Sequence, residues 1–264
     1  MSIDSKSTST ELASRNEEAF KFLDHLQQDF DSAAALLNSD KTSPFARRTY
    51  VRTAGAFVEG TISYFQDYLE SRNKAEPFLG RDELVILEGH ALYLDSQGEI
   101  RKRSVDYPLR QMILFILPLI PRASYCKWRV QIFKNCVSWQ NFCRFLIVTN
   151  AVIHPTCSEH LLVSDLDIEH VHSGIDWFMF QTRYALLLPI VMGYLVGHKL
   201  LKFYENTEVP IPDDVVQTAK QFAEMQDPYG KMVAHLVRLA DRAGISKDEL
   251  TNALDSARDK NYLD

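Results

Sequence analysis

A histidine follows an asparagine by one helical turn near the end of a predicted helix. In the segment TNAVIHP, Asn150 and His154 are four residues apart, so on a helix their side chains share a face. Pro155 disfavours helical backbone at His154, which places the imidazole at the helix end. An imidazole there could act as a general base or acid, or as a cap that interacts with the helix dipole and the last carbonyl groups. Asn150 could orient the ring in either role.

Three arginines in the segment RRTYVR are candidate phosphate-binding groups. Arg48 and Arg52 are one turn apart on a helix face, and Arg47 lies beside them. Metal-independent cleavage of RNA requires a base for the 2′-hydroxyl proton and a cation for the charge that develops on the phosphate. Arg144 lies about 15 Å before His154 along a helix, so the cation would have to come from another helix. The alternative is that these arginines form a solvated face with ion pairs.

Several metal-ligand types gather in the segment HPTCSEH, which contains His154, Cys157 and His160, with Cys143 nearby. Structural zinc sites normally use closely paired ligands at both ends of the site, and the sequence has no Cys-x-x-Cys pair. We therefore predict neither a metal site nor a cofactor. The aromatic residues Trp177, Phe178 and Phe180 are predicted to lie in the core or a dimer interface, with base stacking as the alternative.

Composition limits the classes of protein to consider. The chain has 264 residues, of which 46% are hydrophobic, so it can bury a sizeable core. A net charge of -6 argues against the broad basic surface of a general nucleic-acid binder and leaves room for a local cationic site. The four cysteines are too few for a disulfide scaffold. Residues 1–10 are expected to be a disordered polar leader without a signal peptide, so we predict a cytoplasmic protein.

Apolar stretches at residues 112–120 and 185–197 raise the question of a membrane span. Both are shorter than the roughly 18 to 20 residues that a spanning helix requires. We therefore expect buried core helices and no membrane insertion.

Helical periodicity dominates the chain, and capping residues, prolines and glycines predict where the elements begin and end. Expected helices cover residues 12–37, 45–72, 107–120, 138–154 and about 168–205, and a β-hairpin covers residues 91–104. The expected N-caps are Ser43, Ser138, and Ser164 with Asp165, while Gly98 should supply the hairpin turn and Pro189 a kink. The two prolines of EVPIPDD mark a boundary, which divides the chain into a main helical domain, 11–206, and a C-terminal helical appendage, 207–264.

From about residue 10 to 205, the chain resembles the HEPN superfamily of helical proteins, many of whose members are ribonucleases in toxin, antiphage or RNA-processing systems. The resemblance rests on RRTYVRTAGAFVEG, on LDSQGEIRKR before YPLRQ, and on TNAVIHP followed by an acidic loop and GIDWF. It implies an all-α, HEPN-like bundle with a small β-hairpin insert, and a homodimer. Active members carry an arginine, a short spacer and a histidine; aligned on His154, the arginine position falls on Ile147, Val148 or Thr149. Only Asn150, at the polar position, and His154 match that motif.

The resemblance and the missing arginine predict a catalytically degenerate module that associates with RNA or a nucleotide. Such a module would belong to a defence or toxin–antitoxin system and could have a protein partner. The first alternative is a divergent metal-independent endoribonuclease that uses His154 with an arginine from another helix. The second is a DNA-binding regulator, because LADRAGISKDELTNAL resembles a helix-turn-helix segment. Its second helix carries mainly acidic side chains, which are unfavourable against phosphate: Lys247, Asp248, Glu249, Asn252 and Asp255.

Overall fold

The computed structural model describes residues 5–124, 130–205 and 226–259. The described chain is mostly helical and has one two-stranded antiparallel hairpin, as the sequence predicts. The segment EVPIPDD, predicted as a domain boundary, and Cys126 lie outside the described residues. No described helix combines the length and the apolar character required to cross a membrane.

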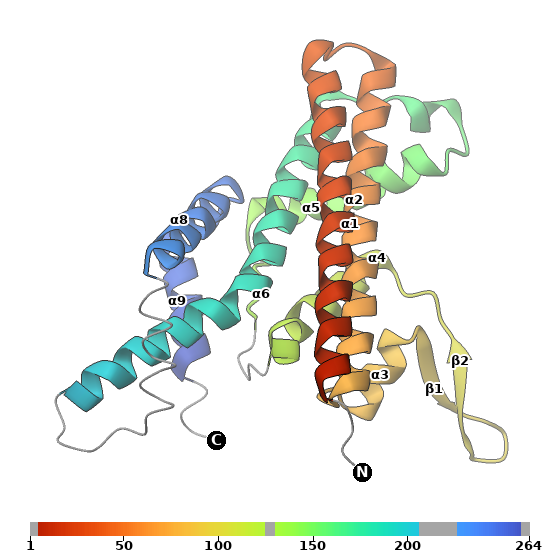
Figure 1. The fold of residues 1–264 in the computed structure, drawn as a ribbon. Coiled ribbons are helices and arrows are strands. Elements are labelled where there is room, and N and C mark those ends of the chain that lie inside the picture. Colours follow the sequence, from red (N-terminus) through yellow and green to blue (C-terminus); the bar gives the residue numbers. More distant parts are fainter. Residues whose placement is uncertain (1–4, 125–129, 206–225, 260–264) are drawn as a thin grey trace.

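Two long helices, α1 (Ser5–Ser39) and α2 (Pro44–Ala75), lie side by side and antiparallel (Figure 1). The Ser43 Oγ accepts a hydrogen bond from the backbone N–H of Ala46 at 3.3 Å, and Pro44 follows as the first helical residue. The N-cap predicted for α2 is therefore confirmed. Because α1 begins at Ser5, helical structure extends into the segment expected to be a disordered leader, of which residues 1–4 lie outside the described chain.

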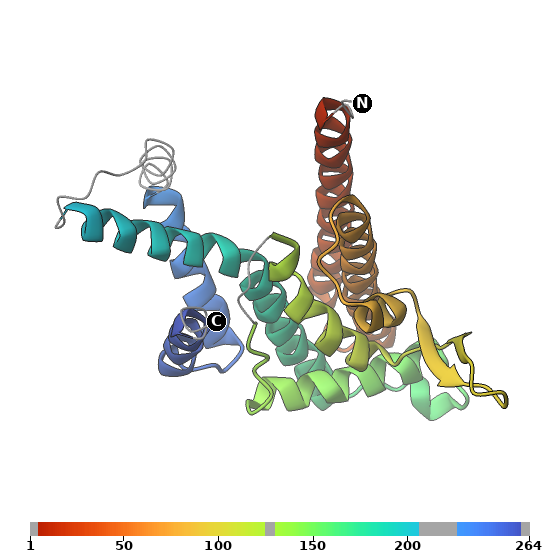
Figure 2. The same ribbon diagram turned by 90° about the horizontal axis from the view of Figure 1, so that it is seen from below.

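A short helix, α3 (Arg81–Leu87), leads into the hairpin of β1 (His90–Leu94) and β2 (Ile100–Ser104). Leu94 pairs with Ile100 next to the turn, where Gly98 has a φ of 78° that a residue with a Cβ rarely adopts. The predicted β-hairpin is therefore confirmed, and it projects from the helical bundle (Figures 1 and 2).

Two predicted helix boundaries were wrong. Instead of one helix to residue 120, α4 (Leu109–Ile116) gives way to the 3-10 turns η1 (Leu117–Leu119) and η2 (Pro121–Ser124), because Pro118 lacks the N–H that an α-helix requires. The next helix, α5 (Val137–Ile153), has Cys136 at its N-cap position, and the Cys136 side chain makes no capping hydrogen bond. Ser138 is instead a buried residue of its first turn, whose Oγ accepts a hydrogen bond from Ser173 at 2.9 Å.

The longest helix, α6 (Asp165–Glu205), packs across α5 and bends along its length (Figures 1 and 2). Its start is a capping box, in which Ser164 and Asp167 exchange hydrogen bonds between side chain and backbone. Trp177, Phe178 and Phe180 have no exposed surface, so their predicted core position is confirmed.

A C-terminal pair, α8 (Gln226–Arg242) and α9 (Lys247–Asp259), lies against α6 on the side away from α1 and α2 (Figure 1). Gly244, at a φ of 65°, ends α8, and Ser246 with Glu249 forms the predicted capping box of α9. Leu239 and Leu250 are buried in the same core as the aromatic residues of α5 and α6. The expected appendage is thus packed onto the main bundle.

Candidate functional site

His154 is the C-cap of α5, as the sequence predicts. Its backbone N–H donates to the carbonyl of Asn150 at 2.9 Å, and its φ of -118° and ψ of 63° end the helix. The side chains of both Asn150 and His154 are exposed. The helix end therefore presents an amide and an imidazole to ligands, one turn apart on the same face.

A close approach of α2 and α5 shapes the neighbourhood of this pair. At Gly55, a Cβ atom would lie 2.3 Å from the Cγ2 of Thr149, so any side chain there would collide with α5. Thr149 is 4% exposed, and its buried hydroxyl has no hydrogen-bond partner. Buried hydroxyl groups are normally satisfied, so the Thr149 hydroxyl lacks a partner that the described chain could supply.

A pocket of about 520 Å³ opens beside Thr149. It is formed by α2, α4 and α5, and we call it the α5-end pocket. Its polar lining residues are Glu59, Arg110, Cys143, Thr149, Asn150 and His154. Its volume falls within the range of sites for small molecules and cofactors.

Two opposite charges enter the α5-end pocket from different helices. Arg110 lies in the first turn of α4 and Glu59 in the middle of α2, and both side chains are exposed. Neither forms an ion pair with another residue in the part of the chain that the structure describes. Both groups are therefore available to a ligand: the guanidinium suits a phosphate or carboxylate, and the carboxylate suits hydroxyl or amine donors.

The predicted phosphate-binding arginines have other contacts. Arg47 forms an ion pair with Asp165 and donates to the carbonyl of Val163 at 2.9 Å. Arg48 reaches the carbonyl of Leu161 at 3.4 Å. These bonds join α2 to the loop between α5 and α6.

Arg52 binds the end of α5 itself. Its Nε and an Nη donate to the carbonyl of Val152 at 3.4 and 3.2 Å. A cation at this position compensates the partial negative charge of the helix end, two residues before His154. None of Arg47, Arg48 and Arg52 lines the α5-end pocket, where the lining arginine is Arg110.

Arg110 and Thr149 are the site residues that the sequence did not single out. The segment YPLRQ showed Arg110 only as a polar position before an apolar run, and nothing in it indicates that α4 approaches the end of α5. The Thr149 hydroxyl is buried without a hydrogen-bond partner because of how α5 packs, which the sequence does not show.

The candidate metal ligands do not form a cluster. Among the described residues, no group of three His, Cys, Asp or Glu side chains is placed to hold a metal ion. His160 instead accepts a hydrogen bond at Nδ1 from the backbone N–H of Thr156 at 3.3 Å. Cys136, Cys143 and Cys157 are free thiols.

Comparisons with known proteins give no family assignment for this arrangement. No protein-family model, curated protein or solved structure matches the chain.

Proposed function

We propose that the chain binds RNA or a nucleotide in the α5-end pocket, as a HEPN-like module without catalytic activity. The observation that carries the proposal is the convergence of Arg110, Asn150 and His154 on one pocket, whose wall contains the unpartnered hydroxyl of Thr149. A single phosphate with its attached nucleoside offers the charge and the hydrogen-bonding groups that these side chains can recognise.

Each side chain has a defined part in this proposal. The planar guanidinium of Arg110 contacts phosphate through two parallel N–H groups. The amide of Asn150 both donates and accepts, so it can pair with a base edge, and the His154 ring can stack on a base or bind a ribose hydroxyl. The net charge of -6 favours a local contact of this kind over a long basic groove.

The negative charge of Glu59 should weaken phosphate binding in the α5-end pocket. Its carboxylate lines the same pocket and repels a phosphate that approaches Arg110. Removing this charge should therefore strengthen binding, provided that the phosphate occupies this pocket.

Fluorescence anisotropy with a short labelled single-stranded RNA, at one fixed salt concentration, tests the proposal. We expect Arg110→Gln to weaken binding about tenfold, because it removes a charge-assisted hydrogen bond to phosphate. Arg81→Gln removes the same charge from an exposed position on α3 and should leave the affinity almost unchanged, while Glu59→Gln should increase it. Equal losses in the Arg110 and Arg81 variants would show only unspecific electrostatic attraction and would contradict the proposal.

A metal-independent endoribonuclease is the second candidate, and the presence of Arg110 and His154 in one pocket favours it. His154 would take the 2′-hydroxyl proton, and Arg110 would stabilise the charge on the phosphate, in place of the arginine missing from α5. Cleavage of an RNA pool in EDTA by the wild-type chain, lost in His154→Ala, would establish this activity. RNA binding without cleavage by the wild-type chain would support the non-catalytic module.

Homodimerisation, a protein partner and a place in a defence or toxin–antitoxin system belong to the same proposal, as implications of the HEPN resemblance. An RNA-binding role also fits the cytoplasmic location expected from the sequence. DNA binding through α8 and α9 has less support, because Leu250 of α9 is buried in the core and the first turn of α9 carries Asp248 and Glu249.

A further inference from the structure

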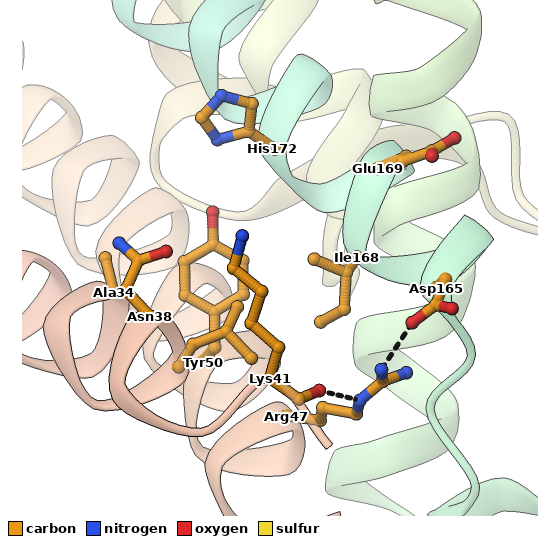
Figure 3. Close-up of a pocket in the computed structure, with 10 residues that line it drawn as sticks. Ala34, Asn38, Lys41, Arg47, Tyr50, Asp165, Ile168, Glu169 and His172 are labelled. Atoms are coloured by element: carbon orange, nitrogen blue, oxygen red, sulfur yellow. Dashed lines mark hydrogen bonds and ion pairs between the residues drawn. The ribbon is translucent and has the colours of Figure 1, made fainter. Parts of the chain in front are cut away.

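We propose that a second pocket, between α1, α2 and the start of α6, binds a small molecule with an anionic head group and an apolar body (Figure 3). This α1–α6 pocket has a volume of about 380 Å³. It shares no lining residue with the α5-end pocket, so it is a separate site. The head group is a carboxylate or a phosphate monoester, which present the same charge and acceptor oxygens.

Arg47 builds one wall of the α1–α6 pocket by joining three segments of the chain. Its guanidinium donates to the carbonyl of Lys41 at 2.6 Å and to the carbonyl of Val163 at 2.9 Å, and it forms an ion pair with Asp165 (Figure 3). The two charges of this pair compensate each other. The wall is therefore held in place without adding a net charge to the pocket.

Tyr50 supplies a buried donor at the pocket. The residue is 3% exposed, and its ring packs against that of Phe30 at a centroid distance of 5.5 Å. Its hydroxyl has no hydrogen bond to any residue in the described part of the chain, although it lines the pocket. Burial, together with the charge of Asp176, raises the pKa of Tyr50 to about 12, so at neutral pH the hydroxyl keeps its proton and donates.

Lys41 and His172 complete a set of donors. The Lys41 ammonium extends alongside the Tyr50 ring toward the same end of the pocket, and the His172 ring lies beyond them (Figure 3). Within the described residues, Lys41 has no carboxylate partner, so its charge is available. Hydrogen bonds from an ammonium to an anion are about twice as strong as those between neutral groups, which favours an anionic ligand here.

The rest of the lining defines the body of the ligand. Ala34, Leu37 and Ile168 provide apolar walls, which a hydrocarbon or aromatic group would cover. The exposed Glu169 carboxylate is directed away from Tyr50 and Lys41 (Figure 3), so it would not contact an anion bound to them.

Titration of the ¹⁵N-labelled full chain with phenyl phosphate, followed by NMR, tests this proposal, with benzoate as the carboxylate probe and phenol as the neutral one. We expect saturable shifts of the backbone amides that line the α1–α6 pocket with phenyl phosphate or benzoate, and much weaker binding of phenol. Lys41→Met should weaken binding about tenfold and Tyr50→Phe severalfold. Tyr50→Phe keeps the ring that packs on Phe30, and Lys41 is exposed, so both variants should fold. Lys74→Met, at the exposed far end of α2, should bind like the wild type.

Three results would overturn the proposal. One is the absence of saturable shifts at these amides at millimolar concentrations of both anions. Another is equal affinity of the wild type and Lys41→Met. The third is competition between an RNA oligonucleotide and phenyl phosphate, with shifts of the same amides. The α1–α6 pocket would then be part of the surface that binds RNA and not a separate site.

Discussion

At the scale of single residues, the α5-end pocket depends on groups that have no partner within the described chain. Asn150 and His154 are exposed at a helix end, and the Thr149 hydroxyl is buried without a hydrogen bond. Arg47, Arg48 and Arg52 differ from them, because each donates to a backbone carbonyl. The contrast separates side chains that hold the loop after α5 from side chains that a ligand can engage.

The ion pair between Arg122 and Glu83 should make the free energy of unfolding depend on pH. Arg122 donates to both carboxylate oxygens of Glu83, and these hydrogen bonds hold the pKa of Glu83 below its ordinary value of 4.5. A carboxyl group whose pKa is lower in the folded state than in the unfolded state stabilises the fold. This stabilisation is fully present at pH values above the unfolded-state pKa, and it is lost as the pH falls through the folded-state pKa. Because the pair is only partly buried, we expect Glu83→Gln to reduce the free energy of unfolding by less than about 1 kcal/mol at pH 7.

Urea denaturation of the wild type and Glu83→Gln at several pH values measures this difference. The difference in free energy of unfolding between the wild type and Glu83→Gln should shrink as the pH falls through 4.5 and below. Glu70→Gln, which removes a carboxylate from the surface pair with Lys74, is the control. A difference between the wild type and Glu83→Gln that grows toward low pH would contradict the assignment.

At the scale of elements, the spacing of α2 and α5 decides whether the α5-end pocket exists. Gly55→Ala would place a Cβ 2.3 Å from Thr149 Cγ2, an atom attached directly to a stiff β-branched carbon. We expect this substitution to lower the free energy of unfolding by about 1–3 kcal/mol through overpacking. We also expect weaker RNA binding, because α5 must shift with Thr149, Asn150 and His154.

Gly60→Ala is the matched control on the same helix. Its Cβ would meet the Cδ1 of Leu26 at 2.6 Å, the far end of a flexible side chain that can turn aside. Alanine also favours helix over glycine by up to about 1 kcal/mol. Chemical denaturation should therefore show little loss for Gly60→Ala, and equal losses in the two variants would contradict the argument for a tight contact at Gly55.

At the scale of the whole molecule, α8 and α9 share a core with the main bundle. Leu239 is 3% exposed within that core, and Arg242 of α8 pairs with the buried Asp176 of α6. We expect Leu239→Ala to lower the free energy of unfolding by about 2–5 kcal/mol through the cavity it leaves. The loss should appear in one transition, seen equally by tryptophan fluorescence and by far-UV circular dichroism.

Asp241→Ala changes an exposed residue of α8 and should alter stability by no more than about 0.5 kcal/mol. Two separate transitions in Leu239→Ala, with the fluorescence of the main bundle unchanged, would show that the C-terminal helices unfold independently of it. That result would support the division predicted from the sequence, in which residues 207–264 form an appendage separate from the main helical domain.

Residue order alone was enough to predict the features that depend on neighbours along the chain. The Ser43 cap, the Gly98 turn, the Ser246–Glu249 capping box and the end of α5 at His154 all follow from local backbone preferences. Where two local signals competed, as at Pro118 within an apolar run, the predicted boundary was wrong. Asn150 and His154 were singled out because their spacing of one helical turn is itself local.

Which helices meet could not be predicted from the residue order and is seen in the folded chain. Arg110 reaches the pocket of His154 because α4 and α5 both pack against α2, and Gly55 permits the contact with Thr149. The same packing sends Arg47 to a different pocket, beside Tyr50 and Asp165. Such contacts join residues far apart in the chain, and they form because burying the apolar faces of several helices together is favourable, which no local pattern specifies.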